Sequence, residues 1–239
     1  MRGNYALQLL VGLLGLVLGS CGPHNQPAAP PTSGDYFPMR KGDRWEYEVR
    51  SRLGKLHVRV EAKGELPVGG QEQRIFVMEE TSDESTALGF VKTSPVGYVQ
   101  EDGYVARILA LDYDDDSTLR LLGRDKPTRI LPLDPKPGDT WDQESSLFTM
   151  PDGKTRPMGW SGEVKTSQPV RVPAGTFSNV VEIDSVYHEP NPQGTLVPSM
   201  RYMDYYARGV GLVRSVTEDV SGEASKRVEW VLLSYSFAD

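Results

Sequence analysis

Histidine, the usual general base and metal ligand, occurs three times in this chain, at His24, His57 and His188. No pair of them has a metal-ligand spacing such as HExxH. His57 lies on the polar side of an alternating segment, and His188 is followed by Glu189 and Pro190. General-base work needs a partly buried and partnered group. We therefore expect all three to be surface residues.

Two further segments resemble catalytic or cofactor motifs but lack required residues. Residues 159–163 (GWSGE) place Ser161 in a partial nucleophile elbow, yet the final glycine is missing and no helix follows. Residues 209–211 (GVG) begin like a dinucleotide fingerprint, but Arg214 replaces the third glycine. The sequence therefore predicts no catalytic residue, no cofactor and a protein that is not an enzyme. A pair of carboxylates of the glycosidase kind stays open, because such a pair leaves no local pattern.

The densest acidic cluster consists of Asp112, Asp114, Asp115 and Asp116. Positions one, three and five from Asp112 match a calcium loop. Ser117 stands at the turn glycine and Gly123 at the bidentate glutamate. We therefore predict a solvated acidic loop and no metal site. Calcium binding is the alternative, and it would need a ligand from elsewhere in the chain.

Cys21 is the only cysteine, so an intramolecular disulfide is excluded. It follows the apolar segment 6–18, which is shorter than the roughly 20 residues a membrane span needs. Residues 18–21 (LGSC) resemble the lipobox of bacterial lipoproteins. The resemblance implies that residues 1–20 are a signal peptide and that Cys21 is lipidated as the first mature residue. The alternative is an incidental thiol at the end of a leader.

The residues after Cys21 indicate which membrane holds the protein and how its folded part is connected to that membrane. Gly22 is not an aspartate, and by the same resemblance this favours the outer membrane in an organism with two membranes. Residues 21–36 are rich in proline and polar residues, which predicts an extended tether. The chain has 26 basic and 33 acidic residues, a net charge of −7. This balance does not suit nucleic-acid binding, so the expected partner is the membrane itself through the lipids on Cys21.

Residues 37–239 alternate apolar and polar side chains over many short segments, beginning with Trp45, Tyr47 and Val49. This period of two predicts an all-β body, built as a curved antiparallel sheet in the form of a sandwich or half-barrel. The phrase GDRW at 42–45 recurs as GDTW at 138–141. We therefore predict two similar β-meander halves, about 37–130 and 131–239. The alternative is that the glycine, aspartate and tryptophan mark generic turns that lead into strands.

Three phrases resemble those of a broad group of mostly uncharacterised secreted bacterial lipoproteins: GDRW at 42–45, VPAGTF at 172–177 and YYARGVGLV at 205–213. The group implies a secreted, lipid-anchored protein and supplies no catalytic residues. It also bears some similarity to the curved antiparallel sheets of periplasmic lipoprotein carriers.

The segment 200–206 is the richest in methionine and tyrosine. As a strand it places Met200, Tyr202 and Tyr206 on one face and Met203 and Tyr205 on the other. Core packing explains such residues, but they also suit a groove for an apolar ligand or an extended peptide. The sequence therefore predicts a non-enzymatic envelope scaffold that binds an envelope protein or component. The alternative is a carrier of an apolar, lipid-like ligand, with Tyr202, Met203, Tyr205 and Tyr206 in its groove.

Overall fold

The computed structural model describes residues 35–68, 74–83, 93–108, 111–113, 118–121, 127–149, 155–220 and 227–238. Cys21, His24 and almost all of the predicted tether lie outside these residues. Within the described ranges the regular structure is strand only, as predicted, and no helix is long and apolar enough to cross a membrane.

Twelve strands pair into one antiparallel sheet, in the order β8-β5-β4-β3-β2-β1-β16-β15-β14-β13-β10-β9. Their bounds are β1 (Arg44–Ser51), β2 (Gly54–Pro67), β3 (Arg74–Ser82), β4 (Thr93–Glu101), β5 (Tyr104–Ile108), β8 (Thr128–Pro132), β9 (Thr140–Thr149), β10 (Thr155–Thr166), β13 (Val180–Pro190), β14 (Leu196–Ala207), β15 (Gly211–Asp219) and β16 (Val228–Ser236). Two small hairpins lie apart from this sheet: β6 (Leu111–Tyr113) with β7 (Leu119–Leu121), and β11 (Val170–Val172) with β12 (Gly175–Phe177).

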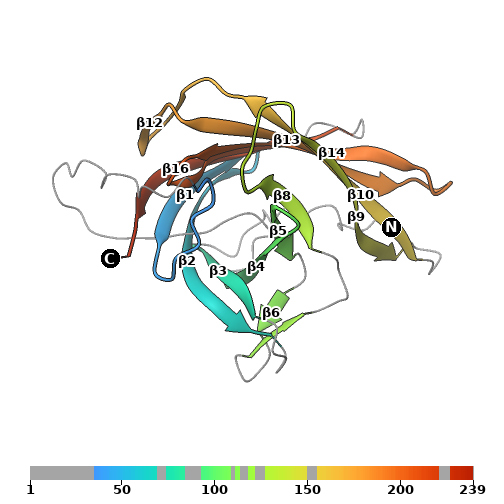
Figure 1. The fold of residues 1–239 in the computed structure, drawn as a ribbon, viewed down its shortest axis with the longest axis horizontal. Coiled ribbons are helices and arrows are strands. Elements are labelled where there is room, and N and C mark those ends of the chain that lie inside the picture. The colour runs from blue at the N-terminus through green and yellow to red at the C-terminus, as the bar shows by residue number, and fades with distance from the viewer. Residues whose placement is uncertain are drawn as a thin grey trace.

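The sheet is rolled, so of the two predicted shapes the half-barrel is correct. Strands β13 to β16 form a broad layer, and β1 to β5 with β8 curl beneath it (Figure 1). Strands β1 to β5 and β13 to β16 are each meanders of sequential neighbours, β8 pairs with β5 after the β6–β7 hairpin, and the pairing of β1 with β16 joins the two groups. The curled shape follows from the right-handed twist of strands, which accumulates across a large sheet.

The two echoed phrases form the same turn. The Gly42 N–H donates to the Ala62 carbonyl and the Gly138 N–H to the Val164 carbonyl, each at 2.8 Å. Both glycines have a positive φ, +91° and +95°, which a side chain would disfavour. The turns match, but the division into two related halves stays a prediction. Its boundary between residues 130 and 131 falls inside β8.

The end strands β8 and β9 meet through side chains, and these contacts close the roll. The Trp141 Nε1–H donates to the Arg129 carbonyl at 3.2 Å, and the Arg129 N–H donates to Gln143 Oε1 at 3.0 Å. The Gln143 Nε2–H donates to the Pro127 carbonyl at 3.3 Å. Backbone groups on the free edge of β8 are thus paired by two side chains of β9. An unpaired edge would expose these groups for pairing with another chain. We call this contact the seam.

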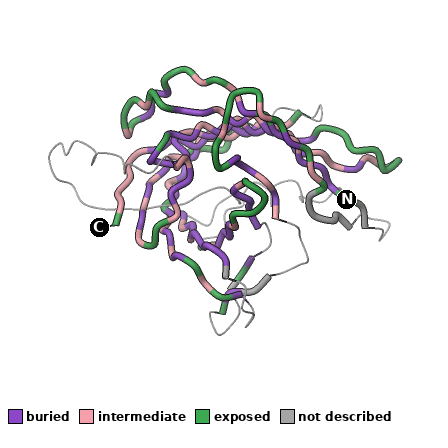
Figure 2. The backbone as a smooth tube through the Cα atoms, in the orientation of Figure 1, coloured by how far each residue is buried: buried purple, intermediate pink, exposed green. Residues whose placement is uncertain are grey.

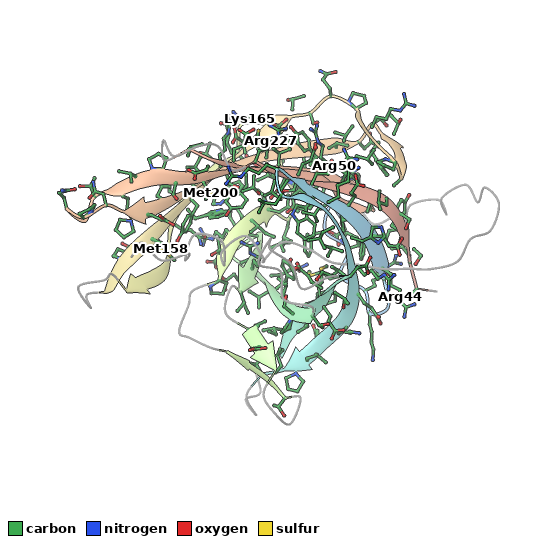
Figure 3. All side chains as sticks on the ribbon, turned by 180° about the vertical axis from the view of Figure 1, so that it is seen from behind. Arg44, Arg50, Met158, Lys165, Met200 and Arg227 are labelled. Atoms are coloured by element: carbon green, nitrogen blue, oxygen red, sulfur yellow. The ribbon has the colours of Figure 1, made fainter. Side chains whose placement is uncertain are left out.

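Side chains from all sides fill the space that the sheet encloses (Figure 3), and many backbone positions of the curled strands are buried (Figure 2). Trp45, Tyr47, Tyr98, Tyr206 and Trp230 are among the largest fully buried residues. Two of them, on β1, also donate hydrogen bonds to backbone carbonyls at the start of β15, two places away in the sheet order. The Trp45 Nε1–H donates to the Val210 carbonyl at 2.5 Å, and the Tyr47 hydroxyl donates to the Leu212 carbonyl at 2.9 Å. A smaller cluster lies under β6 and β7 and includes Ile75, Val77 and Leu119.

The hairpin β11–β12 packs against β15 and β16 on the side away from the curled strands (Figure 1). The Ala174 N–H donates to the Leu232 carbonyl at 3.2 Å, and Val170 and Val172 are buried. β16 therefore has neighbours on both faces in this region. This agrees with its sequence, which is apolar on both sides at Trp230, Val231 and Leu232.

Substitution of Gly162 by Ala tests the seam. A Cβ at Gly162 would overlap the indole ring of Trp141, so the ring must move and its bond to Arg129 must weaken. We expect Gly162→Ala to lower the free energy of unfolding by about 1–3 kcal/mol, measured by chemical denaturation. Gly159→Ala on the same strand is the matched control. Its Cβ meets the end of the Leu196 side chain at 3.1 Å and the His188 Cβ at 3.3 Å, both looser than the overlap at Gly162, so the loss should be smaller. Equal losses in both variants would contradict the role of the seam.

Candidate functional site

The four residues of the predicted groove lie on β14 but on both of its faces. Tyr202 and Tyr206 point into the roll and are 4% and 0% exposed. The Tyr202 ring packs on Trp160, with centroids 5.1 Å apart, and the Tyr206 ring packs on Phe37 at 6.2 Å. Met203 and Tyr205 are half-buried on the other face. The four side chains therefore do not share one surface, and the two inward tyrosines take part in core packing.

Ionisable residues inside the roll are the main feature that the sequence did not predict. Glu80 on β3, Arg107 on β5 and Asp204 on β14 are 4%, 2% and 3% exposed. β3 and β5 are separated by one strand in the sheet order, whereas β14 lies far from both, and the charge of Arg107 acts on both acids. Alternation could have indicated Glu80, since it shares a strand face with Phe76 and Met78. We call these three residues the interior cluster.

Asp204 is the titratable group of this cluster nearest neutrality. Burial raises its pKa to about 6, and the Ser215 hydrogen bond and the Arg107 charge oppose that shift. The Ser215 hydroxyl donates to Asp204 Oδ1 at 2.5 Å. Below this pKa the side chain is a neutral acid, and above it a buried carboxylate must be held by these few partners.

The environment of Glu80 is less favourable for an ionised carboxylate than that of Asp204. Burial raises its pKa well above the usual range, although the Arg107 charge opposes this. Among the described residues, neither oxygen of its carboxyl group has a hydrogen-bond partner. The neutral acid is therefore the form expected near pH 7, because an ionised carboxylate in such a site is costly.

The tyrosines around the cluster stay protonated. Burial raises the pKa of Tyr202 to about 12 and raises those of Tyr47 and Tyr206 well above the usual value. Neutral phenols and a neutral Glu80 offer hydrogen bonds but neither a nucleophile nor a strong base. In chemical terms the cluster can hold polar groups in place, and Asp204 can exchange a proton near pH 6.

The structure brings Ser161 and His188 together, which the sequence did not predict. The Ser161 Oγ lies 3.1 Å from His188 Nε2, between the neighbouring strands β10 and β13. Both side chains are half-buried on the outer face. β10 pairs with β9 on one side and β13 on the other, so its backbone N–H groups are used in the two ladders. Acyl transfer needs free donors for an oxyanion, and this pair has none from its own strand.

The remaining predicted positions lie apart from one another. His57 is on β2, with its Nδ1 3.6 Å from an Asp83 carboxylate oxygen. Asp112 is exposed at β6, and Asp114, Asp115 and Asp116 lie outside the described residues. Across the part of the chain that the structure describes, no group of three or more His, Cys, Asp or Glu side chains is placed to hold a metal ion.

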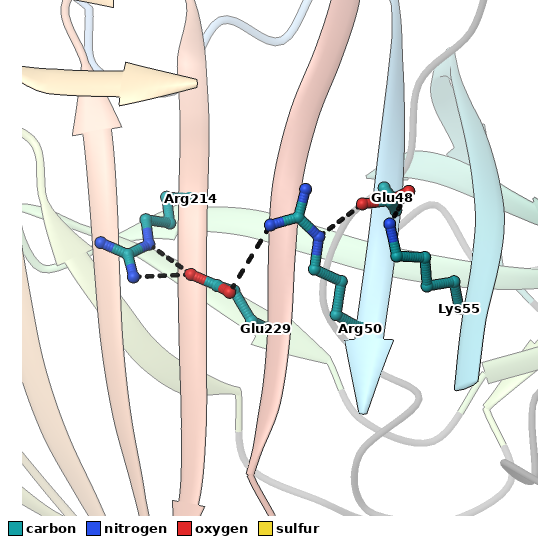
Figure 4. Close-up of polar contacts among 5 residues, drawn as sticks. All are labelled: Glu48, Arg50, Lys55, Arg214 and Glu229. Atoms are coloured by element: carbon teal, nitrogen blue, oxygen red, sulfur yellow. Dashed lines mark hydrogen bonds and ion pairs between the residues drawn. The ribbon is translucent and has the colours of Figure 1, made fainter. Parts of the chain in front are cut away.

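The outer face of β2, β1, β16 and β15 carries a row of alternating charges (Figure 4). Glu48 accepts from both Lys55 and Arg50, and Glu229 binds Arg214 at 2.6 Å and lies 4.0 Å from Arg50. Cross-strand pairs of opposite charge each stabilise a sheet modestly. We call these five residues the charge ladder. One end of the ladder borders a hollow under the hairpin β11–β12.

No protein-family model matches this chain, and no curated protein matches it. Its structure is similar to that of a candidate exported protein of Bacteroides fragilis with a YmcC-like fold. The TM-score is 0.48 at 16% identity, covering 85% of this chain and 100% of the other. It is also similar to a candidate lipoprotein of Parabacteroides distasonis. There the TM-score is 0.47 at 14% identity, covering 85% of this chain and 99% of the other.

The pKa of Asp204 predicts a specific pH dependence. Its folded pKa of about 6 lies above the ordinary 3.8, so the folded state holds the proton more tightly than the unfolded state. The wild-type chain should therefore lose stability from this group as the pH rises from about 4 to about 6, by up to roughly 3 kcal/mol. Asp204→Asn removes that loss. Relative to wild type, the variant should gain stability between pH 4 and pH 7 in denaturation series.

Asp184→Asn is the control of opposite sign. Hydrogen bonding to Arg201 lowers the pKa of Asp184, so the wild-type chain gains stability from this carboxylate as the pH rises. This gain lies below the ordinary pKa of 3.8, so the variant should lose stability relative to wild type as the pH rises to about 4, and the difference should stay constant from there to pH 7. A flat difference between wild type and Asp204→Asn would show that Asp204 is not buried as described.

Proposed function

We propose that the protein is a non-enzymatic lipoprotein of the bacterial cell envelope that serves as a binding scaffold. Lipids on Cys21 hold it at the membrane, and the tether that follows presents the rolled sheet to a partner. The main support for this proposal is the distribution of side chains. The roll encloses packed aromatic and buried ionisable side chains, while charged residues in cross-strand ion pairs occupy its outer face. Gly22 favours the outer membrane in an organism with two membranes.

The side chains inside the roll make the alternative function, a carrier of an apolar ligand, less favourable. An acyl chain in the roll would contact Glu80, Arg107 and Asp204, which are already buried. It would also have to displace Tyr202 and Tyr206 from their ring contacts. Apolar ligand sites are lined mostly by hydrophobic and aromatic side chains with few polar groups. The interior is therefore better suited to holding the fold.

The outer face supports binding without catalysis. The Ser161–His188 pair lies on a fully paired strand, and the acid with a pKa near neutrality, Asp204, is buried in the roll. A reacting substrate would have to reach a nucleophile, a base and oxyanion donors at one point. The described outer surface offers charged side chains in cross-strand pairs instead.

Substitution of Cys21 tests the anchor. We expect Cys21→Ser to move the protein from the membrane fraction to the soluble fraction, because each buried CH₂ of a lipid chain contributes about 0.8 kcal/mol to anchoring. Fractionation of cells followed by immunoblotting measures this. Ser20→Ala keeps a small residue before the cysteine and should leave the protein membrane-bound. Complete membrane retention of Cys21→Ser would reject the lipid anchor.

A further inference from the structure

The hairpin β11–β12 and the outer face of β15, β16 and β1 enclose a surface pocket of about 520 Å³. Two kinds of side chain line it. The charged ones are Arg50, Arg171, Arg214 and Glu229, and the apolar ones are Val172, Pro173 and Val231. We call this hollow the arginine pocket.

The arginine pocket is positively charged in an acidic protein. Its lining has three arginines and one glutamate, whereas the whole chain has a net charge of −7. Glu229 accepts from the Arg214 Nε–H at 2.7 Å and lies close to Arg50 on its other side. The glutamate therefore positions two guanidinium groups (Figure 4), and Arg50 is also paired with Glu48, so Arg171 adds a positive charge that these acids do not balance.

Arg171 is the residue that distinguishes this pocket from an ordinary charge ladder. It comes from the hairpin rather than from the twelve-stranded sheet, and it is exposed. In the described part of the chain it has no ion-pair partner. The ladder is complete without it, since Arg50 and Arg214 are already paired with acids. Its guanidinium group therefore remains available to a ligand.

We propose that the arginine pocket binds a phosphate monoester group carried by a ligand in the envelope. A phosphate monoester carries a charge of about −1.5 to −2 near neutral pH and has several oxygens that can accept hydrogen bonds, and the pocket presents three guanidinium groups to it. Planar guanidinium groups bind phosphate oxygens with paired N–H donors. Val172, Pro173 and Val231 form an apolar wall for the group that bears the phosphate. This inference rests on the proposed function only in assuming that the protein is located in the cell envelope, where it would encounter the ligand.

Calorimetric titration of the full chain with phenyl phosphate tests the proposal, with benzoate as the singly charged comparison at equal ionic strength. We expect saturable binding at one site, with phenyl phosphate bound about tenfold more tightly than benzoate. Arg171→Ala should weaken phenyl phosphate binding at least about fivefold, and Arg171→Lys should weaken it less. Arg59→Ala is the control, because Arg59 is an exposed arginine of β2 outside the pocket.

Three results would overturn the proposal: no saturable binding, equal affinity for benzoate, or equal weakening by Arg171→Ala and Arg59→Ala. Titration with two further ligands, a sugar phosphate and a short-chain phosphatidic acid, identifies the source of the phosphate. Tighter binding of the first indicates a sugar ligand, and tighter binding of the second indicates a lipid headgroup. The outcome is independent of the anchor test. Phosphate binding with full membrane retention of Cys21→Ser would reject the anchor alone, and release without phosphate binding would reject the pocket alone.

Discussion

Closure of the sheet at the seam is the contact on which the rest of the molecule depends. A rolled sheet of twelve strands leaves two edges, and here the short β8 meets the longer β9. Trp141 and Gln143 pair the outward backbone groups of Arg129 and Pro127, so the edge is satisfied without a continuous ladder. Gly162 leaves room for the Trp141 ring against β10. The roll is thus closed by the long side chains of Trp141 and Gln143, and the lack of a side chain at Gly162 makes room for the Trp141 ring.

Closure explains why ionisable groups can be held inside. Glu80 and Asp204 face the interior from opposite meanders, with Arg107 as the charge that acts on both. Such groups are stable in a protein interior when they are neutral or paired. A neutral Glu80 and a hydrogen-bonded Asp204 meet this condition, and an acyl chain in the roll would have to lie against both. This contrast underlies our proposal that binding takes place on the outer face, where charges are solvated and accessible.

Local patterns in the sequence predicted the local structure well. Alternation at Trp45, Tyr47 and Val49 predicted a strand with one buried face, and the glycines of the two echoed phrases lie in matching turns. The all-β class and the curved antiparallel sheet followed from many such segments. These features depend on residues a few positions apart, so a single sequence contains the information.

Contacts between distant strands could not be predicted in this way. The pairing of Ser161 with His188 depends on the register of β10 against β13, and the arginine pocket depends on where the hairpin β11–β12 folds back. The predicted groove shows the same limit. Alternation correctly divided Tyr202 and Tyr206 from Met203 and Tyr205, but only the packing of Trp160 and Phe37 shows what the inward pair contacts.

Backbone hydrogen exchange at Arg129 tests the closed roll most directly. The Arg129 N–H has Gln143 Oε1 as its acceptor, and β8 has no ladder on that side. In the full chain we expect this amide to be protected like an amide of the central strands, and in Gln143→Ala we expect that protection to be lost while β5 and β8 stay paired. Exchange of Arg129 in the wild-type chain at the rate of an unprotected amide would mean that the seam is open. The account of a sealed interior and a binding outer face would then be wrong.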